Sequence, residues 1–305
     1  MAHWSDIPLL TTAVGSYPPG ELSPKRAIQR AVEDQIAAGI DLISDGQVRA
    51  DIISLFAAGI PGFRQRPDDT WQLEAAPAMP QQPLVAGDYL LARLLARGRA
   101  TVKGVLTGPV TLAFSTRLAP GVPYRGSDDP ELLLRLADIL ARETAALVAA
   151  GAEIVQIDEP LLPKAVGGGF DIDLAGQALR EVTAIIPFSI LHICADVRPI
   201  AYDLLSMPIN ALSVAGSQVD VLSAFEADDL ESADIRLIYG CVDTQAPMPE
   251  TREIIQQRIE RAVEQVGAKR LWLSPDCGLR RYSREDAQEL LANLADAAQA
   301  VRAKT

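Results

Sequence analysis

Short apolar runs rich in β-branched residues recur along the chain, and a longer amphipathic segment lies between most neighbouring runs. Such runs are typical of strands buried on both faces, and the segments between them have the apolar spacing of helices. Eight strands that alternate with helices in 305 residues predict a (β/α)8 barrel, also called a TIM barrel. We expect the strands at residues 10–15, 41–46, 102–108, 154–159, 189–194, 209–215, 236–242 and 271–276.

A doubly wound open sheet is the alternative arrangement of these elements. The Gly-x-Gly-x-x-Gly pattern of a dinucleotide-binding sheet does not follow the first run, which disfavours that alternative. The sequence contains no linker, internal repeat or low-complexity tract, so we expect one domain over residues 1–305. A Pro-, Gly- and Gln-rich stretch in residues 60–100 predicts an excursion at the barrel mouth, for which a hairpin is one form. Residues 116–128 form a second long loop, and such loops are often functional lids.

The charge and composition exclude several classes of protein. A net charge of −12 argues against nucleic acid and anionic membranes as partners. No run approaches the ~20 uninterrupted apolar residues of a membrane-spanning helix, and the first residues lack the pattern of a secretory signal. Three widely spaced cysteines argue against a disulfide framework. We therefore expect a cytoplasmic protein.

Polar side chains gather at the ends of the predicted strands. In a barrel of this type, the C-terminal ends of the strands form the active-site face. All three cysteines fall at this end: Cys194 ends the fifth run, Cys241 lies in the seventh and Cys277 follows the eighth. His192 lies two residues before Cys194, so both side chains point the same way from an extended strand.

His192, Cys194 and Cys277 form a candidate metal site. Thiolate-rich ligand sets favour Zn²⁺, and three protein ligands with one open position are the pattern of catalytic zinc. The alternative is that His192 is a core histidine and that the cysteines fill apolar space. Cysteines that only fill space need not share one end of the barrel, which favours the metal site.

Several motifs of the chain resemble those of a known family, in the order the family has them. They are T-A-V-G-S-Y-P, I-S-D-G-Q-V-R-A-D, L-T-G-P-V-T-L, Q-I-D-E-P-L-L, H-I-C and L-S-P-D-C-G-L. Together they resemble the C-terminal, catalytic domain of cobalamin-independent methionine synthase. The resemblance covers essentially the whole chain, and it is to the short, single-barrel forms found in archaea and some bacteria.

The resemblance implies a zinc-dependent methyltransferase that makes methionine from homocysteine. His192, Cys194 and Cys277 would bind Zn²⁺. A free thiol is mostly protonated at neutral pH, whereas a thiol that coordinates Zn²⁺ is deprotonated and becomes the nucleophile. The homocysteine sulfur would take the open position on the metal and attack the methyl group.

The same resemblance implies the residues that bind homocysteine. Ser16, with the backbone around Val14 and Gly15, would hold the carboxylate, and Asp158 would pair with the ammonium group. Gln47 stands where the two-barrel enzymes have a glutamate that contacts this ammonium. An amide can still accept a hydrogen bond there, but it supplies no charge.

Two residues of the family are missing from this chain. The family has a glutamate zinc ligand after the sixth strand, where residues 211–218 contain no carboxylate. It also has a catalytic histidine after the seventh strand, near the place of Gln245, while Asp243 keeps the family's aspartate as a candidate catalytic residue. Water or substrate would complete a three-ligand site, or Cys241 would join as a further ligand.

The missing histidine bears on the methyl donor. A corrinoid that leaves as an anion needs less help from an acid than a folate amine, and several short forms of the family are thought to use one. We therefore expect methylcobalamin or another corrinoid as the methyl donor, in preference to methyltetrahydrofolate. A corrinoid protein that delivers this donor is a candidate partner. Two other functions stay open: alkyl transfer to another thiol such as coenzyme M, and a non-catalytic barrel that binds a corrinoid protein or a metal.

Overall fold

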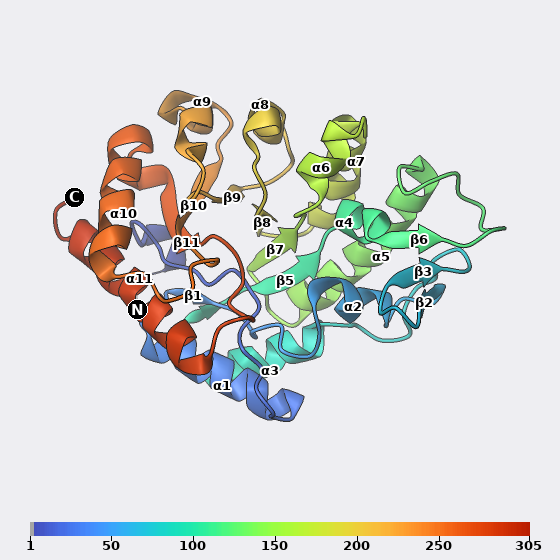
Figure 1. The fold of residues 1–305 in the computed structure, drawn as a ribbon, viewed down its shortest axis with the longest axis horizontal. Coiled ribbons are helices and arrows are strands. Elements are labelled where there is room, and N and C mark those ends of the chain that lie inside the picture. Colours follow the sequence, from blue (N-terminus) through green and yellow to red (C-terminus); the bar gives the residue numbers. More distant parts are fainter. Residues whose placement is uncertain (1–2) are drawn as a thin grey trace.

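Parallel strands pass through the centre of the protein and helices surround them in the computed structural model, which describes residues 3–305 (Figure 1). Six strands form one parallel sheet, in which each strand pairs with the next one along the chain. They are β5 (Gly104–Thr107), β7 (Ile154–Asp158), β8 (Phe188–Ile193), β9 (Ala211–Ala215), β10 (Arg236–Val242) and β11 (Leu271–Pro275).

Two further strand positions close this sheet into a barrel. β1 (Leu42–Ile43) pairs with β4 (Thr101–Val102), which continues into β5 after a single residue. Thr11 and Thr12 then bridge β11 and β1, because the Thr12 amide donates to the Leu273 carbonyl and the Leu42 amide donates to the Thr11 carbonyl. The predicted barrel is confirmed, although the strand expected at residues 10–15 forms only these two bridges.

The helices lie around the outside of the barrel (Figure 1). The longest is α5, which begins at Pro130 after Asp129, whose carboxylate accepts a hydrogen bond from the Glu131 amide at 3.0 Å. The helices are α1 (Pro24–Ala37), α2 (Ile52–Ala57), α3 (Ala86–Ala96), α4 (Pro109–Phe114), α5 (Pro130–Ala149), α6 (Leu162–Gly167), α7 (Ile172–Thr183), α8 (Ala201–Leu204), α9 (Ala227–Ser232), α10 (Arg252–Val266) and α11 (Arg284–Arg302).

The interior of the barrel changes from apolar to polar along the strands. An apolar cluster of seven buried side chains fills the N-terminal end: Leu10, Leu42, Ile154, Ile190, Ala211, Ile238 and Trp272. Two residues further along the strands, polar side chains are buried instead: Thr12, Ser44, Gln156, His192, Ser213 and Ser274. Residues two apart on a strand point the same way, so this second layer lies between the apolar cluster and the active-site face.

Residues 60–100 contain a hairpin and a helix. β2 (Phe63–Gln65) pairs antiparallel with β3 (Trp71–Leu73), and β3 pairs in parallel with β6 (Thr116–Leu118) from the second long loop. These strands form a small sheet at the side of the barrel, and α3 follows them before β4.

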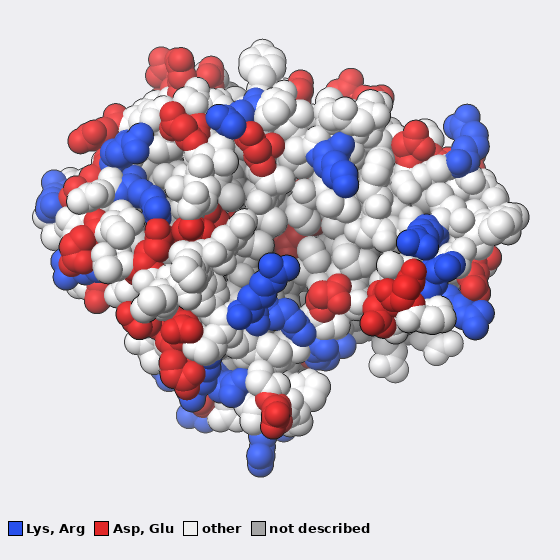
Figure 2. Space-filling view, viewed as in Figure 1, with Lys and Arg blue, Asp and Glu red and all other residues white. Residues whose placement is uncertain are grey.

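Acidic and basic side chains are interspersed over the face of the molecule drawn in Figure 2. Within residues 3–305, no helix has both the length and the apolar character needed to cross a membrane.

Candidate metal centre and substrate cavity

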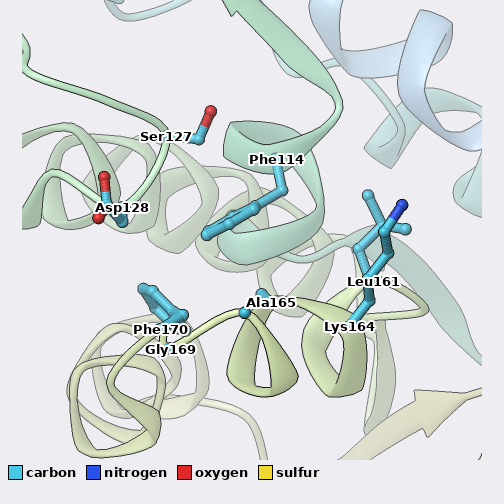
Figure 3. A pocket seen from close by; sticks show the side chains of 9 residues that line it. Phe114, Ser127, Asp128, Leu161, Lys164, Ala165, Gly169 and Phe170 are labelled. Carbon is cyan, nitrogen blue, oxygen red and sulfur yellow. The ribbon is translucent and has the colours of Figure 1, made fainter.

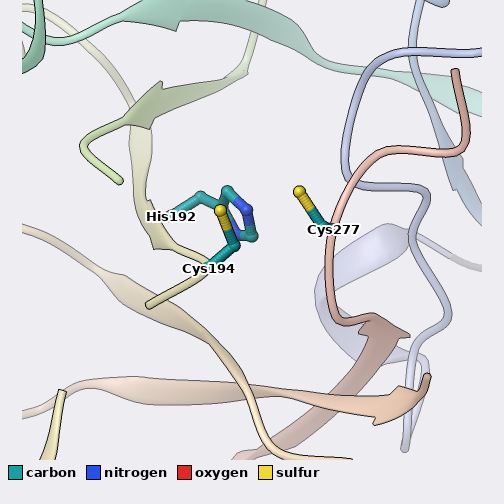
Figure 4. Close-up of side chains that lie close together, drawn as sticks. All are labelled: His192, Cys194 and Cys277. Atoms are coloured by element: carbon teal, nitrogen blue, oxygen red, sulfur yellow. The ribbon is translucent and has the colours of Figure 1, made fainter. Parts of the chain in front are cut away.

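His192, Cys194 and Cys277 come together at the C-terminal end of the barrel (Figure 4). One ligand atom from each residue lies within 4.8 Å of the other two. His192 is on β8 and Cys194 follows that strand, whereas Cys277 follows β11. Because β9 and β10 separate β8 from β11 in the sheet, closure of the barrel brings the three side chains together.

The His192 ring is held in an orientation that suits a metal ligand. Its Nδ1 lies 2.9 Å from the hydroxyl oxygen of Ser213, and its Nε2 is buried with no hydrogen-bond partner among the described residues. When Nδ1 carries the proton and donates to Ser213, Nε2 presents a lone pair beside the two sulfurs. Buried nitrogen atoms are seldom left unpaired, so this atom fits a bound cation.

The pKa values of the two neighbouring thiols shift in opposite directions. A hydrogen bond from Cys194, together with the neighbouring His192, lowers the pKa of Cys277. The same contact and burial raise the pKa of Cys194. A pair of sulfurs that already favours one thiolate, next to an unpaired imidazole nitrogen, has the donor chemistry of a zinc site.

The described part of the chain supplies no carboxylate to this group of side chains. At the end of β9, the cavity beside the sulfurs is lined by Ala215. The carboxylate of Asp276, the residue before Cys277, accepts hydrogen bonds from the amides of Gly216 and Ser217 at 3.0 and 3.1 Å. The structure also leaves Cys241 outside the group, since its buried thiol donates to the Ser274 carbonyl at 3.6 Å.

A cavity of about 460 Å³ opens beside the two cysteines. Its wall includes Ser16, Gln245 and Arg280 as well as Cys194 and Cys277. This volume suits a small polar molecule, and the sulfurs at its wall would meet that molecule directly.

Ser16, expected to hold the carboxylate, lines this cavity, and Gln47, expected to contact the ammonium group, packs against the neighbouring Gly15. Gln47 has a φ of +42° and its side-chain Nε2 is buried without a partner in residues 3–305. Its backbone is held by the Asp45 carboxylate, which accepts from the Gln47 amide at 3.0 Å, and by Arg280, which donates to the Gln47 carbonyl at 3.0 Å. The Gln47 side chain packs closely over Gly15, where a Cβ atom would lie 2.5 Å from Gln47 Oε1 and would displace that side chain. Strained backbone of this kind is often found at functional sites.

Asp158 ends β7 and is buried. Its Oδ1 accepts a hydrogen bond from Gln156 Nε2 at 2.7 Å, and the same nitrogen donates to the Val14 carbonyl at 2.9 Å. Burial raises the pKa of Asp158 to about 6, although His192, Gln156 and Lys103 oppose this shift. At neutral pH the group is therefore mostly a carboxylate.

Both carboxylate oxygens of Asp243 are occupied by hydrogen bonds. One accepts from the Gln245 amide at 2.7 Å and the other accepts from the Gln218 side chain. Gln218 and Gln245 line the cavity, so Asp243 lies directly behind its wall.

Three residues that support the site were missed by sequence reasoning: Ser213, Gln156 and Lys103. They are buried polar residues on or between strands. The signal that could have found them is a polar residue at an inward strand position, two residues from an apolar one.

A second cavity, of about 370 Å³, lies between the segments that follow β5 and β7 (Figure 3). The rings of Phe114 and Phe170 line it and pack edge to face, with centroids 5.3 Å apart at 78°. Lys164 and Leu161 also line it. α4 and α6, which contribute to its wall, are the elements that directly follow the C-terminal ends of β5 and β7.

Residues 20–300 match the model of a family described as the catalytic domain of cobalamin-independent synthase. The chain belongs to this family. It is 33% identical to methionine synthase of Methanothermobacter thermautotrophicus, over 95% of this chain and 99% of the relative. It is also 28% identical to a 5-methyltetrahydropteroyltriglutamate–homocysteine methyltransferase of Burkholderia mallei, over 98% of this chain and 43% of the relative.

Solved structures of the cobalamin-independent synthase family share the fold. A B12-independent methionine synthase from Shewanella sp. W3-18-1 has a TM-score of 0.82 at 20% identity, covering 98% of this chain and 99% of its own. A putative vitamin-B12 independent methionine synthase from Listeria monocytogenes has a TM-score of 0.77 at 19% identity, covering 95% and 96%.

The expectation of a corrinoid methyl donor is wrong. The family is cobalamin-independent by its description, and the Burkholderia mallei relative is named for a methyltetrahydropteroyltriglutamate donor. The expectation rested on the short forms that are thought to use a corrinoid and on Gln245 standing where the family has a histidine. One missing acid affects how a leaving group is protonated, but it does not identify the molecule that leaves. The comparisons therefore do not support a corrinoid cofactor, whether methylcobalamin or another corrinoid. They do not support a corrinoid protein as a partner either.

Proposed function

We propose that this protein is a zinc-dependent methyltransferase that transfers a methyl group to the thiol of homocysteine and so makes methionine. The observation that carries the proposal is the meeting of His192, Cys194 and Cys277 within 4.8 Å, with His192 Nε2 buried and unpaired in the described chain. The methionine synthase relative, matched over nearly its whole length, supports the reaction.

His192, Cys194 and Cys277 hold the metal, and Ser213 orients the imidazole. Bound Zn²⁺ lowers the pKa of a coordinated thiol, so that the substrate sulfur is a thiolate at neutral pH. Two protein thiolates already balance the charge of a divalent cation. Because Ala215 stands at the end of β9, that strand would add no fourth ligand to His192, Cys194 and Cys277.

The cavity beside the sulfurs binds the amino-acid part of homocysteine. Ser16, which lines the cavity, and the backbone of Val14 and Gly15 hold the carboxylate, and the amide oxygen of Gln47 is an acceptor for the ammonium group. The buried carboxylate of Asp158 pairs with the ammonium group. These contacts fix the thiol in place for an in-line attack on the methyl group.

The methyl donor is a methylated tetrahydropteroyl glutamate, as in the name of the Burkholderia mallei relative. The cavity that Phe114 and Phe170 line suits a planar ring, because aromatic side chains pack well against such rings. Lys164 at the wall of this cavity provides a cation for a carboxylate of the donor.

The test is a methionine assay with zinc-replete protein. Homocysteine is supplied with methyltetrahydropteroyl mono- or triglutamate, and we expect methionine from at least the triglutamate. Coenzyme M serves as a control thiol, which we expect to react poorly because it has no ammonium group for Asp158. Less than ~0.2 zinc per chain after metal-replete preparation, or no methionine from either folate, would contradict the proposal.

A further inference from the structure

Lys103 is a buried lysine inside the barrel, between β4 and β5. Its Nζ donates to the Thr12 hydroxyl at 3.0 Å and to Gln156 Oε1 at 2.5 Å. Neither of these two partners is proposed to contact the substrate. Burying an ammonium group is costly unless it is paired, and burial lowers the pKa of Lys103 to about 7, so these two acceptors hold the charge that remains.

Gln156 connects Lys103 to the proposed ammonium site. The oxygen of its side-chain amide faces Lys103, and its nitrogen donates both to Asp158 Oδ1 at 2.7 Å and to the Val14 carbonyl at 2.9 Å. A lysine ammonium has donors and no acceptor, whereas Asp158 and the Val14 carbonyl are acceptors. If the amide were flipped, its nitrogen would face the Lys103 ammonium, donor against donor. Its oxygen would then face Asp158 Oδ1 and the Val14 carbonyl oxygen, acceptor against acceptor.

We infer that Lys103 is a positioning residue for homocysteine: it holds the Gln156 amide, which holds Asp158 where the substrate ammonium is recognised. This inference rests on the proposed function. Without Lys103, the buried Gln156 Oε1 would lose the donor that it has among the described residues, and a buried unpaired oxygen drives the amide to move. The positive charge near Asp158 would also be lost, and Lys103 is one of the groups that lower the pKa of that carboxyl.

The first experiment compares zinc-loaded wild type with Lys103→Met, using homocysteine and 4-mercaptobutanoate, which is the same thiol acid without the amino group. We expect KM for homocysteine to rise about tenfold, as for the loss of one hydrogen bond to a charged group, while zinc content and kcat change little. KM for 4-mercaptobutanoate should stay within about twofold, so the preference for homocysteine falls. Thr144→Val removes a buried hydroxyl in α5 and is the control for a loss of stability alone.

A double-mutant cycle tests whether Lys103 acts through Gln156. If it does, Lys103→Met combined with Gln156→Met should raise KM for homocysteine no further than Gln156→Met alone. Additive effects, or an unchanged preference in Lys103→Met, would overturn the inference. If Lys103→Met does not fold, Lys103→Leu removes the same ammonium group and has the same expected result.

A crystal structure of the Lys103 variant provides a readout that does not depend on the substrate. We expect Gln156 to have lost at least one of its bonds to Asp158 and Val14. If both bonds remain in place, the inference is wrong whichever thiol the enzyme methylates. If wild type does not methylate homocysteine, the proposed function fails, and this structure still decides whether Lys103 positions Asp158.

Discussion

Cys277 is the residue through which the last barrel strand joins the proposed zinc site. Cys277→Ser should reduce bound zinc from about one per chain to near zero, because a serine hydroxyl is not ionised at neutral pH and is a poor zinc ligand. Metal analysis by mass spectrometry measures this. Cys241→Ser is the matched control, since Cys241 is a buried cysteine outside the group and its variant should keep zinc. Full zinc in Cys277→Ser would show that the ligand assignment is wrong.

The raised pKa of Asp158 predicts that substrate binding depends on pH. Its pKa is raised by burial to about 6, so it takes up a proton in mildly acidic solution, where an ordinary aspartate stays ionised. Only the carboxylate pairs with an ammonium group, so KM for homocysteine should rise as pH falls from about 7 to about 5. Steady-state kinetics over this range measure the effect. Asp158→Asn should have a high KM that varies little with pH, and a wild-type pH profile in that variant would exclude Asp158 as the group responsible.

The candidate ligands could be predicted from the sequence, but the residues that orient them could not. His192, Cys194 and Cys277 each lie at a strand end, and strand ends share one face of a barrel. The contact between His192 and Ser213 depends on the register of β8 against β9. Register follows from the packing of the whole sheet, so the sequence around either residue does not contain it.

Helix α5 shows how one capping residue supports an element next to the proposed donor cavity. Asp129 is buried, and its carboxylate accepts from the amides of Glu131 at 3.0 Å and Arg125 at 2.9 Å. Asp129→Ala should lower the free energy of unfolding by about 1–2 kcal/mol, the usual cost of losing an N-cap. Urea denaturation measures it. Asp128→Ala, in the exposed neighbouring position, should change stability by less than about 0.5 kcal/mol, and equal losses in both variants would contradict the capping role.

Strands that are marked by an apolar run in the sequence could be predicted. Strands that form only by pairing with a segment far away in the sequence could not. The β7, β8 and β9 strands are apolar runs and were expected close to their observed bounds. The strand expected at residues 10–15 is reduced to two bridges, because a side chain, Asp41, takes up the Thr11 amide. The pairing of β3 with β6 joins two long loops, and neither loop alone indicates it.

At the scale of the molecule, the alternation of strands and helices was sufficient to predict the barrel. The methyl donor was not predictable in this way. In the proposed function, the donor binds in a cavity built from segments after β5 and β7, including Phe114 and Phe170, which are far apart in the sequence. The corrinoid donor was inferred in part from one missing histidine. That inference was wrong, because a single residue does not determine which donor several elements bind.

Closure of the barrel depends on Asp41, which joins the first strand position to the last helix. Its carboxylate accepts from the amide and the hydroxyl of Thr11 at 2.9 and 2.8 Å and pairs with Arg302 of α11. Thr11 is buried, so Asp41→Ala would leave its amide without a partner. We expect the free energy of unfolding to fall by about 1–3 kcal/mol, measured by urea denaturation.

The control for this variant is an ion pair of the same charge type at the surface. Glu74 pairs with Arg64 at 3.5 Å, with side chains 45% and 72% exposed. Glu74→Ala should therefore cost less than about 1 kcal/mol, because water screens exposed pairs. Asp41→Ala should also weaken zinc retention, since Thr12 bonds to Leu273 on β11, the strand that carries Cys277 to the site. Equal stability and equal zinc in the two variants would mean that the barrel does not depend on this junction for its closure.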